Sequence, residues 1–380
     1  MKKLRIAVIG NIITQGSADV FLKKFLRILL PLTETVYVFS DWSHNSNDSR
    51  IKVVTPVRFV IKRLFTEDLS AKTRITRYLL VQLVTCINLL KAAKCIHVIL
   101  IFDTLMVGPI FLAKLMRKKV VPFVAAKVQT TLPKEITLGK CQTKIVELAK
   151  HVVFSLSDII IVESTNLIYW LNLNRYKNKL RVRSTFVNTD IFKPVVELKK
   201  RADIVGYVGN LIESKGVKQF VKSFPFVMEK RPSVSFLICG DGPCYQEIKQ
   251  IVTENQCSEK VILTGWIDHS KIPTYLNQLK LLVLPSETEG LPNIILETMA
   301  CGTPVLATPV GGIPDIIRDG ETGFLLKSND PKHIADRITE LLGKPGLLEK
   351  VSVNAHRNVG ENFSFQKTLE AWQKIFNELH

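Results

Sequence analysis

Hydrophobic residues gather in short, nearly continuous runs, and longer segments with the spacing of amphipathic helices lie between them. Clear runs occupy residues 4–9, 98–102, 120–125, 204–208 and 281–284. A continuous apolar run bounded by turn residues is typical of a strand that is buried on both faces of a parallel sheet. Strands that alternate with helices predict an α/β protein built from parallel sheets.

The clearest strand–helix–strand unit spans residues 281–310. Its first strand, 281–284, is followed by a polar loop, and a helix is predicted to begin at Pro292, because proline lacks the N–H that a first helical residue leaves unpaired. The second strand follows at 305–308. In open parallel sheets ligands bind beyond the carboxyl ends of the strands, so the loop 286–291 is predicted to lie at a binding edge.

Two carboxylates belong to this unit. Glu289 lies in the loop, and Glu297 lies more than a turn deeper, inside the helix. The start of the helix attracts anions, because N–H groups and the positive end of the helix dipole point into the same crevice. A ligand with a phosphate at the helix start and hydroxyl groups at both carboxylates would be a nucleotide sugar, which contains ribose, diphosphate and hexose. Taken singly, each has a plainer explanation, with Glu289 an ordinary loop carboxylate and Glu297 an exposed helix residue.

Several spaced motifs resemble the family 4 glycosyltransferases, a large retaining group with the GT-B fold. The motifs are EGLPNIILETMACGTPVLATPVGGIPDIIRDGETGFLL (289–326), GYVGNLIESKG (206–216), ICGDGP (238–243), LTGWI (263–267) and, more weakly, NTDIFKP (188–194). The resemblance covers the C-terminal half well and the N-terminal half poorly. It implies two Rossmann-like domains with parallel sheets that face each other across a cleft.

The length of 380 residues also favours two domains over a single core. The expected boundaries are an N-terminal acceptor-side domain at 1–190, a linker at 191–203 and a nucleotide-sugar domain at 204–362. A C-terminal helix at 363–380 is expected to cross back to the N-terminal domain, as it does in the family.

The resemblance also assigns site residues. Lys215 and Glu289 are the expected catalytic residues: Lys215 stabilises charge on the leaving diphosphate, with the backbone at Pro292 and Asn293, and Glu289 orients the sugar. Glu297 is expected to hold the ribose. The full donor-binding set implied is Gly16, Asn210, Lys215, Gly265, Trp266, Glu289, Gly290, Leu291, Pro292, Asn293 and Glu297.

Some of these positions have second explanations or depart from the family pattern. Gly16 fits a plain strand-to-helix turn equally well, and Trp266 fits an ordinary packing aromatic. Asn210 stands where the family usually has arginine, so neutralisation of the diphosphate rests more heavily on Lys215. The family histidine that follows the 120–125 strand is missing here. His97 and His151 lie nearby in the sequence, but His97 fits a core or strand-face position better.

The basic residues are unevenly distributed. The net charge is +18, and residues 1–195 hold 31 Lys and Arg against 12 Asp and Glu, while the rest of the chain is nearly balanced. Such asymmetry indicates an anionic partner for one domain. The segment 57–94 interleaves cations with large apolar residues, which predicts a helix lying on an anionic membrane surface. A helix whose apolar stripe packs on the sheet fits the same pattern. The cations that mark it are Arg58, Lys62, Arg63, Lys72, Arg74 and Arg77.

Composition excludes other classes of site. No cofactor or metal is expected, because the seven cysteines and seven histidines show no ligand spacing and no Asp-x-Asp is present. Scattered cysteines fit a reducing cytoplasm. No transmembrane span is expected, because the longest apolar stretch, 78–90, is short and interrupted by polar residues. The N-terminal apolar run fits a first strand better than a signal peptide.

These features favour a retaining glycosyltransferase that moves a hexose from a nucleoside diphosphate sugar to a hydroxyl acceptor, possibly lipid-linked. The protein is expected to be cytoplasmic and peripherally bound to the membrane. Alternatives of the same fold are a nucleotide-sugar epimerase and a sugar phosphorylase, and a non-catalytic membrane or partner-binding subunit is another. Nucleic-acid binding is not expected, because no nucleic-acid motif accompanies the charge.

Overall fold

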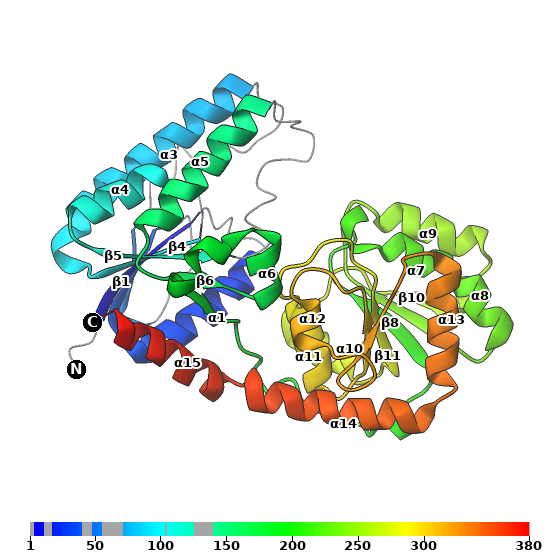
Figure 1. Ribbon diagram of the computed structural model, residues 1–380. Coiled ribbons are helices and arrows are strands. Elements are labelled where there is room, and N and C mark those ends of the chain that lie inside the picture. The colour runs from blue at the N-terminus through cyan, green and yellow to red at the C-terminus, as the bar shows by residue number, and fades with distance from the viewer. Residues whose placement is uncertain are drawn as a thin grey trace. The chain divides into compact units, whose positions relative to one another are not determined.

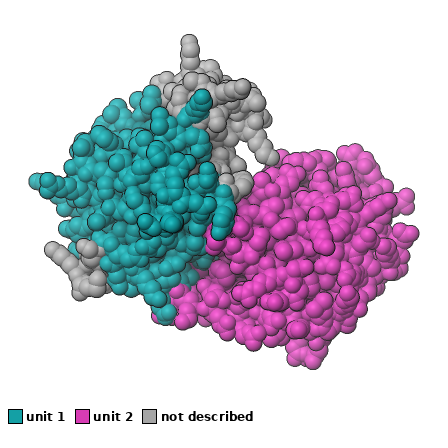
Figure 2. All heavy atoms as spheres, viewed as in Figure 1, with its two compact units in different colours: residues 1–163, 168–185, 368–380 teal, residues 164–167, 186–367 magenta. Residues whose placement is uncertain are grey.

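The computed structural model describes residues 4–10, 17–39, 48–54, 71–102, 105–124 and 140–379, without the side chains of 17–20, 71–78, 140–143, 145 and 170. The chain divides into two compact units (Figures 1 and 2). Unit 1 comprises residues 1–163, 168–185 and 368–380, and unit 2 comprises residues 164–167 and 186–367.

Unit 1 contains a seven-stranded parallel sheet in the order β3-β2-β1-β4-β5-β6-β7. The strands are β1 (Leu4–Ile9), β2 (Thr33–Phe39), β3 (Ile51–Val53), β4 (Val98–Ile101), β5 (Lys119–Val124), β6 (Ile160–Val162) and β7 (Leu180–Val182). The helices with residues in this unit are α1 (Ser17–Leu32), α3 (Ala71–Ala92), α4 (Val107–Leu115), α5 (Lys140–Leu156), α6 (Thr165–Trp170) and α15 (Phe365–Glu378). Short 3-10 helices lie at η1 (Ala93–Cys95) and η3 (Leu173–Lys179).

Unit 2 contains a six-stranded parallel sheet in the order β10-β9-β8-β11-β12-β13. The strands are β8 (Ile204–Val208), β9 (Ser235–Cys239), β10 (Val261–Leu263), β11 (Leu281–Leu284), β12 (Val305–Ala307) and β13 (Phe324–Leu325). The helices are α7 (Val217–Lys222), α8 (Phe224–Lys230), α9 (Tyr245–Glu254), α10 (Ile272–Leu276), α11 (Asn293–Ala300), α12 (Ile313–Ile316), α13 (Pro331–Leu342) and α14 (Pro345–Asn362). Four 3-10 helices complete it: η4 (Leu198–Lys200), η5 (Glu213–Lys215), η6 (Ser258–Lys260) and η7 (His269–Lys271).

The predicted α/β class with two parallel sheets is confirmed. The runs 4–9 and 281–284 are strands with the predicted bounds, and every residue of β11 is buried. One boundary prediction is wrong by a residue: Pro292 has an extended backbone, and helix α11 begins at Asn293. Proline therefore precedes the first helical turn here and does not begin it.

Strand order locates the binding edge of each sheet. In unit 2 the chain builds β8, β9 and β10 outward on one side, then returns to place β11 beside β8. The loops that leave β8 and β11 therefore diverge and open a crevice at the carboxyl ends of these two strands. In unit 1 the same reversal lies between β1 and β4.

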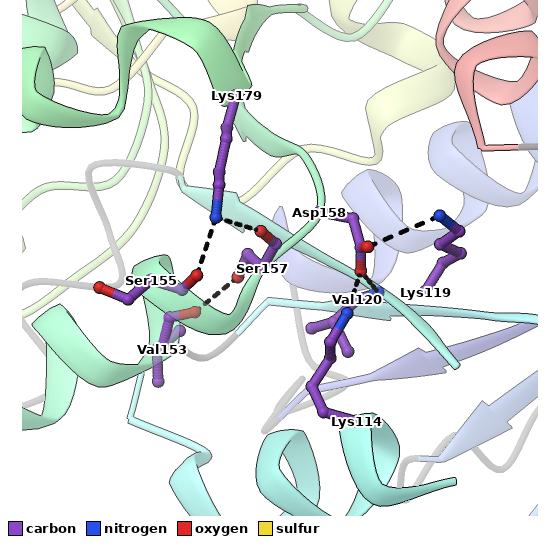
Figure 3. Close-up of polar contacts among 8 residues, drawn as sticks. All are labelled: Lys114, Lys119, Val120, Val153, Ser155, Ser157, Asp158 and Lys179. Carbon is purple, nitrogen blue, oxygen red and sulfur yellow. Dashed lines mark hydrogen bonds and ion pairs between the residues drawn. The ribbon is translucent and has the colours of Figure 1, made fainter. Parts of the chain in front are cut away.

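A small polar cluster fastens helices to the sheet of unit 1 (Figure 3). The Asp158 carboxylate accepts hydrogen bonds from Lys114 Nζ and from the Val120 backbone N–H, both at 2.8 Å. Lys119 Nζ lies 3.7 Å from the same carboxylate. Lys179 Nζ donates to the carbonyl oxygens of Ser155 and Ser157, each at 2.8 Å, and so caps the carboxyl end of α5. The cluster ties α4 and α5 to the starts of β5 and β6.

Helix α15 completes the core of unit 1. Trp372 is fully buried, and its ring lies 5.1 Å from Phe25 and 6.2 Å from Phe123, centroid to centroid. Arg181 on β7 binds Glu378 near the end of the helix at 2.5 Å. The last helix of the chain is thus an integral part of the unit that contains the first strand.

Candidate functional site

The candidate site lies in unit 2, at the carboxyl ends of β8 and β11. Lys215 comes from the loop after β8, and Glu289 comes from the loop after β11. Lys215 Nζ lies 2.5 Å from Glu289 Oε1, and the two side chains are 20% and 8% exposed. Ser286 Oγ donates a 2.7 Å hydrogen bond to the same carboxylate oxygen. The structure therefore joins the two residues that the sequence assigned to catalysis.

Close backbone packing brings the two loops together. Gly216 adopts a left-handed conformation with φ +65°, and a Cβ at this position would collide with the carbonyl oxygen of Pro285. Gly311 has φ +57°, and a Cβ there would collide with the carbonyl oxygen of Glu289. The Glu287 N–H donates to the Ser214 carbonyl at 2.9 Å across the same contact. Glycine at position 216 lets the loops after β8 and β11 approach until Lys215 and Glu289 meet, and Gly311 lets the loop after β12 pack against Glu289.

Glu297 lies on α11, and its side chain is 4% exposed. Its Oε1 lies 3.0 Å from His269 Nε2, which η7 supplies from the loop region after β10. The Phe192 ring packs against the imidazole at 5.4 Å between centroids. Glu297 is therefore a buried, partnered carboxylate, and the alternative of an exposed helix residue is wrong.

Other predicted donor-site residues of unit 2 lie on the loops that follow β8 and β10. Asn210 is exposed, and its carbonyl accepts a 2.9 Å hydrogen bond from the Tyr207 hydroxyl. Gly265 has φ +69°, and its carbonyl accepts from the Gly240 N–H at 2.9 Å, which aligns the loops after β9 and β10. Trp266 is 70% exposed, so it is not a core-packing aromatic.

The loop between β11 and α11 is anchored to its neighbours. The carbonyl of Gly290 accepts from the Gly312 N–H at 2.7 Å. Pro292 is buried, and Leu291 and Asn293 are partly buried. Thr308 Oγ1 donates to the Ser286 carbonyl and so ties the loop to the end of β12. The first turn of α11 thus faces the same edge as Lys215 and Glu289.

Two residues beneath the site were not foreseen from the sequence. Tyr207 is fully buried at the end of β8, and burial, followed by the nearby Glu289 carboxylate, raises the pKa of its phenol. Tyr207 therefore stays neutral and donates to the loop that holds Asn210. His269 lies 28 residues before Glu297 in the chain. The only local signal for it is its place just after the LTGWI motif.

Some sequence assignments fall elsewhere. Gly16 and the stretch 126–129, where the family histidine is missing, lie outside the described residues. His97 lies just before β4, and its Nδ1 accepts from the Arg5 N–H at 3.2 Å, so it occupies the edge of the sheet opposite to the strand carboxyl ends. His151 lies on α5, with its Nδ1 2.6 Å from the Tyr176 hydroxyl. Neither position substitutes for the missing histidine at the strand ends.

Metal ligands do not gather anywhere in the described part of the chain: it contains no group of three or more His, Cys, Asp or Glu side chains suited to a metal ion. Lys215 forms an ion pair with Glu289, and Glu297 is hydrogen-bonded to His269. A cation and carboxylates at one edge of a sheet can bind a ligand that carries both phosphate and hydroxyl groups.

Comparison with known families identifies this unit. Residues 188–358 match the family described as "Glycosyl transferases group 1". This segment is similar to the group 1 glycosyltransferases. The predicted resemblance to family 4 glycosyltransferases is thereby confirmed for the segment that holds Lys215, Glu289 and Glu297.

Curated relatives match the same region. The capsular polysaccharide biosynthesis glycosyltransferase CapM of Staphylococcus aureus is 30% identical over 179 residues, which cover 46% of each chain. This chain spans about half the length of the curated relatives that it matches. The glycosyltransferase domain is thus the part of the chain that the relatives share.

Solved structures match nearly the whole chain. A sucrose-phosphate synthase from Thermosynechococcus elongatus has a TM-score of 0.76 at 18% identity, over 99% of both chains. HepE of Anabaena, in complex with UDP, has a TM-score of 0.74 at 15% identity, over 98% of this chain and 100% of HepE. At such identities the likeness shows the fold, and the predicted GT-B fold is confirmed.

Proposed function

We propose that the protein is a retaining glycosyltransferase, which moves a hexose from a nucleoside diphosphate sugar to a hydroxyl acceptor without a metal. The observation that carries the proposal is the contact of Lys215 with Glu289 at the edge of β8 and β11. One side chain of this pair suits a phosphate and the other suits sugar hydroxyls. Their junction is therefore the place for the bond between diphosphate and sugar.

The charge balance at the diphosphate rests on few groups. Lys215 supplies one positive charge, and Asn210 supplies none where the family usually has arginine. The first turn of α11 adds the positive end of a helix dipole. Charge that develops on the leaving diphosphate is stabilised by these groups, because they are fixed before the reaction and lie in a partly desolvated site.

Glu297 suits the ribose. Its buried carboxylate is fixed by His269, so it can accept hydrogen bonds from two neighbouring hydroxyls without reorientation. Trp266, which is largely exposed, lies on the loop after β10, where the nucleotide base would rest. In this proposal the hexose of the donor meets Glu289, the diphosphate meets Lys215 and the ribose meets Glu297.

Retention is proposed to proceed on the front face of the sugar. The leaving phosphate takes the proton of the acceptor hydroxyl, which removes the need for a separate protein base. The name of CapM, a capsular polysaccharide glycosyltransferase, and the UDP bound to HepE support a nucleotide-sugar donor and a glycan acceptor.

We also propose a cytoplasmic location and reversible attachment to an anionic membrane, where the acceptor is lipid-linked. The excess of 31 basic over 12 acidic residues in 1–195 supports this. Residues 57–70 of the predicted basic segment, 57–94, lie outside the described residues, as do the side chains of Lys72, Arg74 and Arg77. No helix in the part of the chain that the structure describes is long and apolar enough to cross a bilayer.

The test is a thermal-shift screen with UDP, GDP, ADP and TDP and their sugar conjugates, followed by donor hydrolysis and NMR of the product anomer. A rise in melting temperature with one nucleoside diphosphate is expected for the wild type and for Lys222→Ala, and not for Lys215→Ala. Lys222 is an exposed lysine of the same unit and serves as the matched control. Nucleotide binding without hydrolysis or transfer would favour a non-catalytic subunit, and an inverted product would refute retention.

A further inference from the structure

Helix α3 presents an apolar face to solvent. The side chains at 79, 80, 83, 87 and 90 lie within about 100° of the helix circumference. All five are aliphatic, and Leu83 and Leu90 are 57% and 55% exposed. No charged residue occurs from Tyr78 to Leu90. The exposed members of this face are Leu79, Leu80, Leu83, Ile87 and Leu90.

The opposite face of α3 carries polar residues, and one of them is bonded to α4. Gln82 Oε1 accepts a 2.8 Å hydrogen bond from the Gly108 N–H at the start of α4. Thr85 is buried and donates to the Val81 carbonyl at 2.7 Å. Leu89 is also buried beside them. The helix therefore turns Gln82, Thr85 and Leu89 inward and leaves five aliphatic side chains exposed, instead of burying a purely apolar stripe.

The apolar surface continues on the neighbouring helices. Phe111 and Leu115 lie one turn apart on α4 and are 57% and 67% exposed. Leu148 on α5 is also exposed. Figure 1 shows α3, α4 and α5 side by side in unit 1. Exposed apolar side chains gathered on adjacent helices favour an interaction site, whereas single exposed leucines are common. We call these residues of α3, α4 and α5 the apolar face.

Cations border the apolar face and acids are scarce. Residues 71–119 contain nine Lys or Arg and one acidic residue. Lys114 and Lys119 are engaged by Asp158, as Figure 3 shows. Lys91 and Lys94 at the end of α3, and Arg117 and Lys118 after α4, have no acidic partner among the described residues. Their charge complements an anionic surface.

We propose that the apolar face of α3, α4 and α5 rests on an anionic lipid bilayer. Its aliphatic side chains enter the boundary between headgroups and acyl chains, and Lys91, Lys94, Arg117 and Lys118 bind the headgroups. This proposal extends the proposed function by naming the surface that would meet a membrane carrying the acceptor. The α3 part of the apolar face, Leu79–Leu90, lies within the predicted 57–94 segment, and α4 and α5 add residues that the sequence pattern did not include. Binding through the apolar face requires no transfer activity.

The first experiment measures co-sedimentation with vesicles of phosphatidylglycerol and phosphatidylcholine. The variant Leu83→Glu/Ile87→Glu is expected to lower the partition coefficient by about tenfold or more. The matched control, Ile262→Glu/Val353→Glu, changes two exposed aliphatic residues of unit 2 and should bind as the wild type does. Lys91→Glu/Lys94→Glu should bind vesicles more weakly at low salt, and its binding should depend less on salt concentration than that of the wild type.

The second experiment measures insertion. Leu83→Trp should be quenched by lipids with brominated acyl chains, whereas Val353→Trp should not. Equal vesicle binding by the wild type and Leu83→Glu/Ile87→Glu would overturn the proposal. A second result would also overturn it: light scattering that shows a dimer for the wild type and a monomer for Leu83→Glu/Ile87→Glu. The apolar face would then be covered by a second copy of the chain. The thermal shift with nucleoside diphosphate is measured for each variant to separate the donor-site proposal from the membrane proposal. A variant that loses lipid binding but keeps the thermal shift still has an intact donor site.

Discussion

His269 Nε2 lies 3.0 Å from Glu297 Oε1, and the imidazole is the more exposed partner of an almost fully buried carboxylate. The imidazole therefore controls the orientation of the carboxylate that we assign to the ribose. His269→Ala should weaken nucleoside diphosphate binding about tenfold, the equivalent of about 1.4 kcal/mol, because Glu297 loses a fixed hydrogen-bond partner. Isothermal titration calorimetry measures this.

A cycle with Glu297→Gln gives the control. The effects of His269→Ala and Glu297→Gln should be less than additive, since both act through one carboxylate. His269→Gln keeps a donor in the side chain and should restore part of the affinity. Additive losses would mean that His269 meets the nucleotide directly and does not act through Glu297.

The contact of Lys215 with Glu289 leads to a prediction about the diphosphate. Lys215→Ala should abolish measurable nucleotide affinity, because Asn210 brings no charge to the same loop. Asn210→Arg should bind the nucleotide as tightly as the wild type or more tightly. Titration of both variants at one ionic strength is the measurement, and wild-type affinity in Lys215→Ala would place the phosphates elsewhere.

Glu289 should matter more for the reaction than for the fold. Glu289→Ala should reduce transfer by about 10²-fold or more, on the order of 3 kcal/mol of transition-state stabilisation, with little change in nucleoside diphosphate affinity. Glu297→Ala should reduce transfer to a similar degree while weakening the nucleotide. Initial rates with the donor found in the screen test both. Turnover at the wild-type rate in the folded double variant would refute the roles of both glutamates.

Arg201 should be a main determinant of the stability of unit 2. It is 6% exposed, and its guanidinium donates to the carbonyls of Val196, Leu279 and Cys301 and to Thr303 Oγ1. Burial lowers the pKa of this guanidinium, although it remains charged at neutral pH. Arg201→Met should lower the free energy of unfolding by about 3 kcal/mol, because several buried carbonyls lose their donor.

Urea unfolding followed by circular dichroism measures the effect. Arg318→Met removes an exposed arginine from the same unit and should change stability by less than about 0.5 kcal/mol. A similar small change in Arg201→Met would mean that water replaces the guanidinium at these carbonyls.

The strands and the site loops of unit 2 could be predicted because they depend on local signals. Continuous apolar runs located β8 and β11, and the motifs after them located Lys215 and Glu289. The partnership of His269 with Glu297 could not be predicted, since it depends on how η7 and α11 pack. The burial of Glu297 was missed for the same reason.

Helix α3 shows a different limit. Periodicity predicted an apolar stripe, but two orientations fit that stripe, one against the sheet and one toward lipid. In the structure Gln82, Thr85 and Leu89 face inward, and Gln82 accepts a hydrogen bond from the Gly108 N–H of α4. Tertiary contacts of this kind determine which face of a helix is buried, and they cannot be predicted from residue spacing alone.

The insertion of Trp372 among Phe25 and Phe123 has a consequence for synthesis of the protein. Unit 1 is begun by the first strand and completed by residues 368–380, whereas unit 2 is formed mainly by the continuous segment 186–367. Unit 1 therefore cannot close its core until the last residues of the chain have been made. Without the ring of Trp372 the contacts to Phe25 and Phe123 are missing, so truncation near the carboxyl terminus would damage the part of the protein that was made first.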